Sequence, residues 1–275
     1  MYHIALLLTV HNRKDLTLKC LESIYQGIQL CASDTYSFNV YMVDDASVDG
    51  TSEEVSKRYP SVNIISGNGE LYWCRGMFVA WTTAISYKKY DFYILINDDI
   101  ILKIDSMKKI LFASECFDNQ AILSGAFCSK LNGKLTYGGA LKDGKSFAPN
   151  GSYRKIIIFC ANFLLVPKAV VDKIGIIDNV FHHAVGDYDY ALRAYEFGIQ
   201  SYLMPEYVGT CEAHSNIDKC YDPTYSLRER FAFLYSPLYH PLDTFILLKR
   251  HYSCFRAIGV WLKIHLLVLF PSLKI

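Results

Sequence analysis

The sequence lacks several features that would place it in other protein classes. Its 28 Lys and Arg residues are balanced by 27 Asp and Glu residues, so it has none of the positive charge with which a general nucleic-acid binder holds phosphates. No stretch reaches the roughly 18 uncharged apolar residues of a membrane-spanning helix. Residues 1–10 run directly into polar residues, so we expect no signal peptide. Internal repeats and low-complexity linkers are also missing, which favours one large domain or one domain with an appendage.

Paired cysteine motifs are missing too. The chain has nine cysteines, an odd number, and no Cys-x-x-Cys spacing. This pattern argues against a disulfide framework and against a zinc site. We expect buried thiols in the reducing environment of the cytoplasm.

One stretch, residues 93–101, combines an apolar run with two adjacent carboxylates, Asp98 and Asp99, which follow Asn97. A short continuous apolar run predicts a buried strand of a parallel sheet. Open α/β sheets bind ligands at the carboxyl ends of such strands. Because Mg²⁺ and Mn²⁺ prefer oxygen ligands and are often completed by phosphates, we expect Asp99, beside Asp98, to hold a divalent metal that grips a diphosphate. The alternative is a strand-to-helix turn in which an aspartate caps the next helix.

Further buried strands are predicted at residues 4–10, 39–43, 62–65 and 122–127, and amphipathic helices lie between several of them. This alternation predicts a doubly wound, mostly parallel sheet flanked by helices. Residues 133–144 predict one hairpin with turns at Asn132-Gly133 and Asp143-Gly144. Pro167 predicts the start of a helix over residues 168–174.

Three motifs in this order resemble those of the family-2 inverting glycosyltransferases of GT-A fold: Thr9-Val10-His11-Asn12-Arg13, Asp44-Asp45-Ala46-Ser47-x-Asp49-Gly50-Thr51 and Asn97-Asp98-Asp99. The resemblance implies an α/β fold with a Rossmann-like GT-A domain over residues 1–220. It also implies transfer of a hexose or deoxyhexose, with inversion, from a nucleoside diphosphate sugar such as a UDP- or dTDP-sugar. The implied acceptor is a hydroxyl-bearing glycan or a lipid-linked acceptor, in surface polysaccharide or glycolipid assembly.

The resemblance also assigns roles to individual residues. It places the metal, Mn²⁺ or Mg²⁺, on Asp99, with His214 as a further metal or diphosphate ligand. The residues it assigns to the nucleotide are Thr9, His11, Arg13, Asp44, Asp45, Arg75 and Asp98. Judged from residue type alone, Asp45, Ser47 and Asp49 could instead form turns and cap the helix that follows, and His214 could be structural.

The loop at residues 67–77 contains three glycines and two adjacent aromatic residues, which predicts close approach to a ligand. Trp73 could stack on a sugar or base, or it could be a core residue at the start of a helix. Arg75 offers a guanidinium fork to a phosphate. The segment from Ala161 through Asn162 to Pro167 resembles the acceptor side of the family, so Asn162 is expected near the acceptor or sugar.

A second carboxylate pair, Asp187 and Asp189, lies at the start of a predicted helix. Asp189 and Arg193 are four residues apart and should face each other, whereas Asp187 at the helix entry is free to point into a cleft. The family signature here reads Glu-Asp-x-Asp-Leu-x-x-Arg, and its first Asp is the catalytic base. This resemblance implies that Asp187 is the base and that Asp189 and Arg193 orient it. The chain carries Gly186 where the family has Glu, and a simple helix cap is the alternative for Asp187.

Acidic residues are absent from residues 244–275, which contain five Lys or Arg among leucines and aromatic residues. We therefore predict an amphipathic helical appendage over residues 221–275. Helices of this type lie on anionic membrane surfaces, here the inner face of the membrane. The alternative is that they pack on the core or on a second subunit of a homodimer.

Two other functions fit parts of the sequence. A sugar-1-phosphate nucleotidyltransferase shares the strand order and the metal carboxylates, but it needs a basic, Gly-rich loop where this chain has residues 11–15. A non-catalytic nucleotide-sugar-binding module is compatible with Gly186. Metal-dependent hydrolysis or transfer with a panel of sugar nucleotides separates these alternatives.

Overall fold

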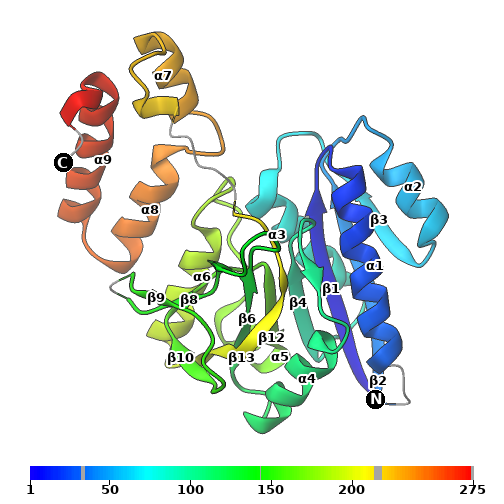
Figure 1. The fold of residues 1–275 in the computed structure, drawn as a ribbon. Coiled ribbons are helices and arrows are strands. Elements are labelled where there is room, and N and C mark those ends of the chain that lie inside the picture. The colour runs from blue at the N-terminus through cyan, green and yellow to red at the C-terminus, as the bar shows by residue number, and fades with distance from the viewer. Residues whose placement is uncertain (32–34, 143, 214–218, 274–275) are drawn as a thin grey trace.

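In the computed structural model, residues 1–31, 35–142, 144–213 and 219–273 are described. A central sheet carries helices on both faces, and a group of C-terminal helices stands beside it (Figure 1). The first half of the sheet is parallel and consists of β1 (Tyr2–Val10), β2 (Tyr36–Asp44), β3 (Val62–Ser66) and β4 (Phe92–Ile96). The predicted strands are therefore present, and the longest of them extend beyond their predicted ends.

The polar residues that follow these strands come together because the strands are parallel. The last residue of β1, Val10, lies opposite Asp44 at the end of β2, and the backbone N–H of Asp45 donates to the carbonyl of Val10 at 2.9 Å. β4 pairs with the other side of β1. The chain thus presents its strand-end motifs at one edge of the sheet, which is the usual ligand side of an open α/β sheet.

The second half of the sheet is mixed. It contains β6 (Ile122–Cys128), β12 (Phe163–Pro167), β13 (Ser201–Thr210) and the edge strand β10 (Arg154–Ile156). The strand order is β10-β13-β6-β12-β4-β1-β2-β3, and β5 (Ile101–Leu102) pairs with β13. β12 runs antiparallel to both of its neighbours, because the chain reaches it from the ligand side of the sheet. The whole is a largely parallel α/β sheet, as the sequence predicts.

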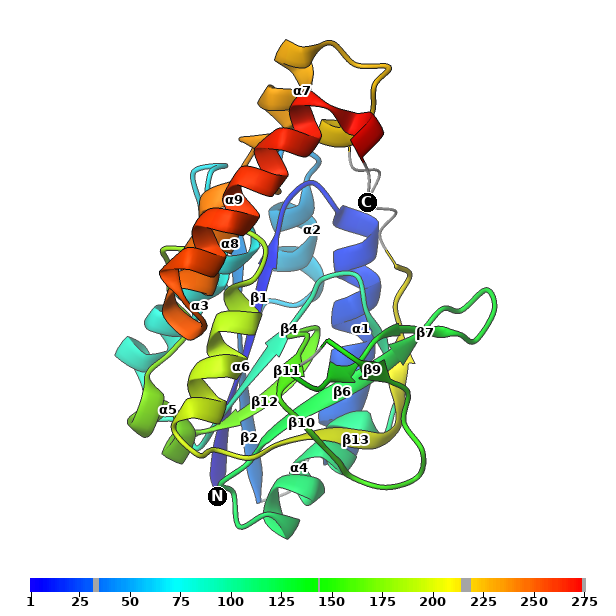
Figure 2. The same cartoon turned by 90° about the vertical axis from the view of Figure 1, so that its left-hand side faces the viewer.

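Helices cover both faces. α1 (Lys14–Cys31), α2 (Thr51–Arg58) and α4 (Ser106–Cys116) contribute to the core on one face. The opposite face carries α3 (Tyr72–Tyr87), α5 (Lys168–Ile174) and α6 (Gly186–Glu196) (Figure 2). Trp81 of α3 is fully buried at the centre of this second core, against Tyr93 of β4 and Tyr190 of α6. Removing a buried aromatic side chain of this size costs about 3–5 kcal/mol, so this contact fixes α6 firmly to the sheet.

The single hairpin predicted at residues 133–144 is wrong. The turn at Asn132-Gly133 joins β6 to β7 (Leu135–Tyr137), and the next turn joins β8 (Gly139–Ala140) to β9 (Ser146–Phe147). β8 also pairs with β11 (Ile158–Phe159), in a small three-stranded sheet of its own. The turns at Asn132-Gly133 and at Gly144 each close a different pair of strands, and Asp143 lies outside the described residues.

The C-terminal region is helical: η1 (Lys219–Tyr221), α7 (Leu227–Leu234), α8 (Pro241–His251), α9 (Cys254–Leu269) and η2 (Pro271–Leu273). A small core of Cys220, Leu234 and Val268 holds this region together. Leu247 of α8, however, belongs to the large core of the sheet. Within the described residues, none of the helices has both the length and the apolar character needed to cross a membrane.

All nine cysteines are free thiols. Five are buried, Cys128 and Cys160 are half-buried, and Cys116 and Cys254 are exposed. The expectation of buried thiols therefore fails at these two exposed positions on helices α4 and α9.

Candidate active site

A pocket of about 310 Å³ lies at the carboxyl ends of β1, β2 and β4. Its wall includes six residues that the sequence assigns to the site: Thr9, His11, Arg13, Asp45, Trp73 and Asp98. The sequence assigns no role to the other five wall residues, Val10, Gly69, Tyr72, His183 and Leu238. Tyr72 could have been found beside Trp73 in the glycine-rich loop, whereas no local signal points to Leu238, which lies in the turn between α7 and α8.

Asp45 fastens the glycine-rich loop to the sheet. Its carboxylate accepts backbone hydrogen bonds from Gly69 at 2.7 Å, Leu71 at 2.9 Å and Tyr72 at 3.0 Å. A Cβ atom at Gly67 would lie 2.6 Å from Asp45 Oδ1, so glycine is required for this approach. Asp45 thus shapes the pocket wall. A contact from Asp45 to a base or ribose would use carboxylate lone pairs that do not accept these backbone hydrogen bonds.

Asp44 points into its own loop instead of into the pocket. One oxygen accepts from the backbone N–H of Ser47 at 2.9 Å, and the other accepts from the hydroxyl of Ser52. Asp49 likewise accepts from the backbone of Lys14 at 2.9 Å and of Thr51 at 3.1 Å. These contacts match the turn-forming alternative, and a nucleotide role for Asp44 remains a prediction.

Asp98 and Asp99 share one guanidinium. Arg13 Nη1 lies 3.2 Å from Asp98 Oδ1 and 3.2 Å from Asp99 Oδ2. Within the described part of the chain, the buried Asp98 Oδ2 has no hydrogen-bond partner. Burial raises the pKa of Asp98 to about 6; Arg13 opposes this shift and the neighbouring Asp99 adds to it. Two adjacent carboxylates with one unsatisfied buried oxygen form a donor set that suits a hard divalent cation.

A chain of contacts supports this carboxylate pair from behind. Trp73 Nε1 donates to Asn97 Oδ1 at 2.8 Å, and the backbone N–H of Asn97 donates to the carbonyl of Asn162 at 3.0 Å. Asn162 Nδ2 lies 3.9 Å from Cys211 Sγ, which in turn lies 3.6 Å from Asp99 Oδ1. Asn162 therefore sits beneath the carboxylates, and Cys211 is a site neighbour that sequence reasoning missed. The predicted ligand His214 lies outside the described residues.

Arg75 does not reach the pocket wall. Its Nε donates to the carbonyl of Asn179 at 3.2 Å. Burial and the neighbouring His182 are the main causes that lower the pKa of His240, and the charge of Arg75 lowers it further. A phosphate contact by Arg75 remains a prediction that requires its side chain to turn.

Asp187 is the second residue of α6, as the sequence predicts. Its Oδ1 accepts from the backbone N–H of Tyr188 at 2.9 Å, and its Oδ2 accepts from that of Ala161 at 3.3 Å. Burial raises the pKa of Asp187 to about 6, although both N–H groups act in the opposite direction. A carboxylate with this pKa is ionised at neutral pH and still binds protons well, which suits a general base.

Glycine replaces the family's glutamate at position 186 because Cys74 occupies the space. A Cβ atom at Gly186 would lie 2.3 Å from Cys74 Sγ. The preceding residue, Val185, has a left-handed φ of 58°, which is unusual and strained for a β-branched side chain. The approach to Asp187 is therefore shaped by close packing and by strain.

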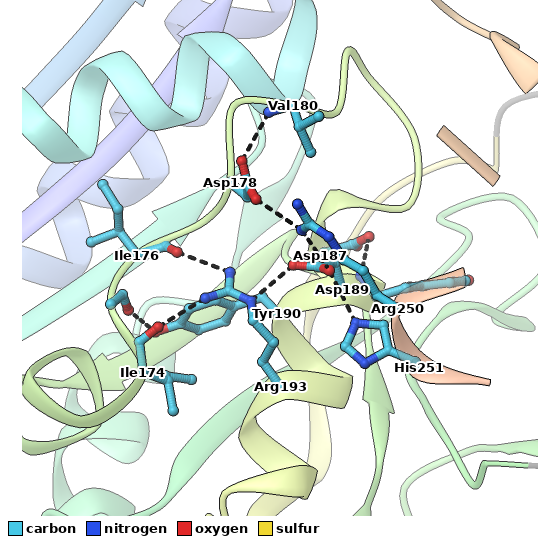
Figure 3. Close-up of polar contacts among 12 residues, drawn as sticks. Ile174, Ile176, Asp178, Val180, Asp187, Asp189, Tyr190, Arg193, Arg250 and His251 are labelled. Carbon is cyan, nitrogen blue, oxygen red and sulfur yellow. Dashed lines mark hydrogen bonds and ion pairs between the residues drawn. The ribbon is translucent and has the colours of Figure 1, made fainter. Parts of the chain in front are cut away.

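Asp189 is completely buried and holds three basic side chains (Figure 3). Its Oδ2 accepts from Arg193 Nε at 2.8 Å, so the predicted pair on α6 is confirmed. Its Oδ1 lies 3.2 Å from Arg250 Nη1 and 3.0 Å from His251 Nε2, both on α8. Asp189 therefore ties the C-terminal region to the helix that carries Asp187.

A second link joins the loop before α6 to the start of α8. Asp243 accepts from the backbone N–H of His182 at 2.9 Å and lies 2.8 Å from His182 Nδ1, and the ring of His240 stacks on that of His182. Ligand atoms of these three residues lie within 4.8 Å of one another, so they could hold a metal. Both oxygens of Asp243 already serve His182, however, and stacked rings do not aim their nitrogens at one point. We therefore interpret the cluster as a brace of α8.

Comparisons with known proteins agree with this fold. The sequence model described as "Glycosyl transferase family 2" matches residues 6–175, while the comparison with curated protein sequences finds no match. The crystal structure of S. aureus TarS 1-349 superposes with a TM-score of 0.54 at 16% identity, over 94% of this chain and 74% of that chain. The same TarS fragment in complex with UDP gives 0.56 at 14% identity, with the same coverage.

The mannosyltransferase PcManGT from Pyrobaculum calidifontis, in complex with GDP-Man and Mn²⁺, is similar as well. It gives a TM-score of 0.56 at 13% identity, over 98% of this chain and 86% of that chain. At these identities the likeness establishes the fold, which is the GT-A arrangement that the motifs predict.

Proposed function

Because the chain belongs to glycosyl transferase family 2, we propose that it transfers a sugar from a nucleoside diphosphate sugar to a hydroxyl group, with inversion at the sugar carbon. The observation that carries this proposal is the placement of Asp187. It is a largely desolvated carboxylate at the entry of α6, and its pKa is suited to accepting a proton. The pocket with Asp98 and Arg13 provides the complementary site for a charged donor.

In this mechanism Asp187 removes the proton from the acceptor hydroxyl as its oxygen attacks the sugar carbon. The two backbone N–H groups on its oxygens fix the orientation of the carboxylate. A single displacement from the side opposite the leaving diphosphate inverts the configuration of that carbon. General-base assistance of this kind typically contributes about 10²- to 10⁴-fold to the rate.

The donor occupies the pocket at the strand ends in this proposal. Asp99, with Asp98, would hold Mn²⁺ or Mg²⁺, and the ion would neutralise charge on the departing diphosphate. Arg13 lies against both carboxylates and adds a fixed positive charge. Trp73 has its indole N–H held by Asn97, so its ring face is presented firmly for stacking on a base or sugar.

The remaining assignments follow the same placement. Thr9, His11 and Asp45 line the pocket where a nucleoside would lie, and Asp44 and Arg75 are proposed as outer contacts. The bound UDP in one similar structure, and GDP-Man with Mn²⁺ in another, support a nucleotide-sugar donor and a divalent metal. Asn162 is proposed to act from beneath the carboxylates, on the acceptor side.

We further propose that the protein works at the inner face of a membrane, through the C-terminal region at residues 221–275. One side of α9 exposes a stripe of large apolar residues: Phe255, Ile258, Leu262, Leu266 and Leu269. Phe255 is 88% exposed. Arg256 and Lys263 lie among them without any acidic residue nearby in sequence, so an anionic lipid surface complements both features. Such a location favours a lipid-linked acceptor and a role in surface polysaccharide or glycolipid assembly.

A thermal-shift panel of sugar nucleotides, with Mn²⁺ and with EDTA, tests the proposal. We expect at least one nucleoside diphosphate sugar to stabilise the protein only when metal is present, and the Asp99→Ala variant to lose this response while keeping its unliganded melting temperature. A metal-independent response of equal size in wild type and variant would refute the metal assignment. Binding without any turnover would favour the non-catalytic module.

A further inference from the structure

A second cavity, of about 570 Å³, lies beside α6, and its wall includes sequence neighbours of Asp187 but not Asp187 itself. Tyr188 and Cys160 line this cavity. The backbone N–H of Tyr188 donates to the Asp187 carboxylate, and so does that of Ala161, the residue after Cys160. The strand-end pocket includes neither of these residues in its wall. We call the second cavity the side cavity. It is separate from the strand-end pocket and lies beside the residues whose N–H groups hold the carboxylate of the proposed base.

Short strands on one side and the helices α6 and α8 on the other enclose the side cavity. The turn between β8 and β9 contributes Lys142, α6 contributes Tyr188, α8 contributes Leu247, and Tyr252 directly follows α8. Figure 1 shows the β8–β9 hairpin reaching toward the turn between α8 and α9. The contacts of Asp189 with Arg250 and His251 hold α8 against α6, so they position one wall of this cavity and also stabilise α6.

Positive charge gathers at Tyr252. Lys142 Nζ lies 5.5 Å from the centre of the Tyr252 ring and 5.3 Å from that of Tyr195, and Arg256 Cζ lies 4.3 Å from the centre of the Tyr252 ring. In the described ranges of the chain, neither Lys142 nor Arg256 forms an ion pair with a carboxylate. Among the described residues that line the side cavity, Lys142 is the one charged side chain.

Arg256 is not part of the cavity wall, but it lies against the same Tyr252 ring as Lys142. Two cations without carboxylate partners at one ring favour the binding of an anion. Guanidinium and ammonium groups bind phosphate through charge-assisted hydrogen bonds. Tyrosine rings such as Tyr188 and Tyr252 offer apolar faces and a polar tip to the rings of sugars. A neutral glycan would leave the charge of Lys142 and Arg256 unused.

We propose that the side cavity seats the acceptor, and that this acceptor is a sugar carrying a phosphate group, which Lys142 and Arg256 bind beside Tyr252. This inference rests on the proposed function, because it assigns the second substrate of the same reaction. The phosphate can belong to a lipid headgroup or to a soluble sugar phosphate. The exposed Phe255 next to Arg256 places an apolar surface beside the phosphate site, so the two sources should bind differently.

Calorimetric binding of three probes tests this proposal: glucose 1-phosphate, methyl α-glucoside and decyl phosphate. EDTA is present so that the paired carboxylates cannot attract phosphate through a metal. We expect glucose 1-phosphate to bind roughly tenfold more tightly than methyl α-glucoside, a factor that corresponds to one net charge-assisted contact. Decyl phosphate binding more tightly than glucose 1-phosphate identifies a lipid headgroup as the source, and the reverse order identifies a soluble sugar phosphate.

Two variants locate the effect. The double substitution Lys142→Gln with Arg256→Gln should abolish the preference for phosphate, whereas Lys263→Gln, which removes a cation elsewhere on α9, should retain it. Equal affinity of wild type for glucose 1-phosphate and methyl α-glucoside overturns the proposal, as does a preference that survives in the double variant. Nucleotide binding is measured on the same proteins in the presence of Mn²⁺. If the phosphate preference is absent but nucleotide binding is intact, the acceptor proposal fails while the proposed function stands.

Discussion

The carboxylate of Asp189 and the imidazole of His251, 62 residues later in the chain, lie 3.0 Å apart in the interior of the protein. Arg250 reaches the same carboxylate oxygen and also Asp178. The first turn of α6, which carries Asp187, is therefore held by a helix of the C-terminal region. Residues 221–275 cannot be regarded as a dispensable extension, since truncating them would leave Asp189 with one partner in place of three.

Asp189→Asn should destabilise the protein strongly. The substitution leaves Arg193, Arg250 and His251 facing a neutral group in a buried site, and breaking a buried ion pair in this way typically costs about 3–5 kcal/mol. Chemical denaturation measures the change. Glu54→Gln is the matched control because its pair with Arg58 is exposed, and such surface pairs contribute about 0–1 kcal/mol. Equal effects of the two substitutions would contradict the structural role of Asp189.

Gly186→Ala should destabilise the protein through a clash with Cys74. The added Cβ would lie 2.3 Å from the thiol sulfur, and overpacking of this kind costs typically about 1–3 kcal/mol. Adding Cys74→Ala removes the sulfur and should recover most of the loss, which a double-mutant cycle detects as coupling. Additive effects of the two substitutions would show that Cys74 is not the reason for glycine at this position.

The pH dependence of stability should carry the signature of Asp187. Its pKa is raised from the ordinary 3.8 to about 6 in the folded protein, so the folded state binds this proton more tightly than the unfolded state does. The associated stability is present below about pH 4 and is lost as the pH rises through about 6. Asp187→Asn avoids this loss and should be more stable than wild type at pH 7 by about 1–3 kcal/mol, with the difference vanishing near pH 4. Melting temperatures of both proteins from pH 4 to pH 8 check this expectation, and a difference that does not vary with pH would contradict it.

Replacing Phe255 and Leu262 by serine should weaken binding to anionic vesicles. Both side chains are exposed on α9, so the substitutions remove apolar surface without opening the core, unlike a truncation that deletes α8. Co-sedimentation with phosphatidylserine vesicles measures the effect, with Leu131→Ser, an exposed leucine on a distant turn, as the control. Binding that is unchanged, together with a loss of self-association in sedimentation, would identify the stripe as a homodimer interface.

The sequence predicts those parts of this fold that depend on local pattern. The strand-end motifs assemble because parallel strands place their carboxyl ends at one edge, and α5 spans Lys168–Ile174 as Pro167 predicts. Contacts between segments that are far apart in the chain leave no comparable pattern in the local sequence. Leu238 in the pocket wall and the two basic residues of α8 on Asp189 follow only from the packing of the C-terminal region. Cys211 lies beside Asp99 because it directly follows β13 in the sheet. The departure at Gly186, unexplained in the sequence, becomes intelligible once Cys74 is seen to fill its place.

The most direct test of the central claim is the turnover of Asp187→Asn with a donor that the thermal-shift panel identifies. Release of the nucleoside diphosphate in the presence of acceptor and Mn²⁺ measures turnover, and titration of the free nucleotide measures donor binding. Asparagine keeps the shape of the side chain and removes the proton acceptor, so turnover should fall by about 10²- to 10⁴-fold while nucleotide affinity stays the same. Near wild-type turnover in Asp187→Asn would contradict the assignment of Asp187 as the base.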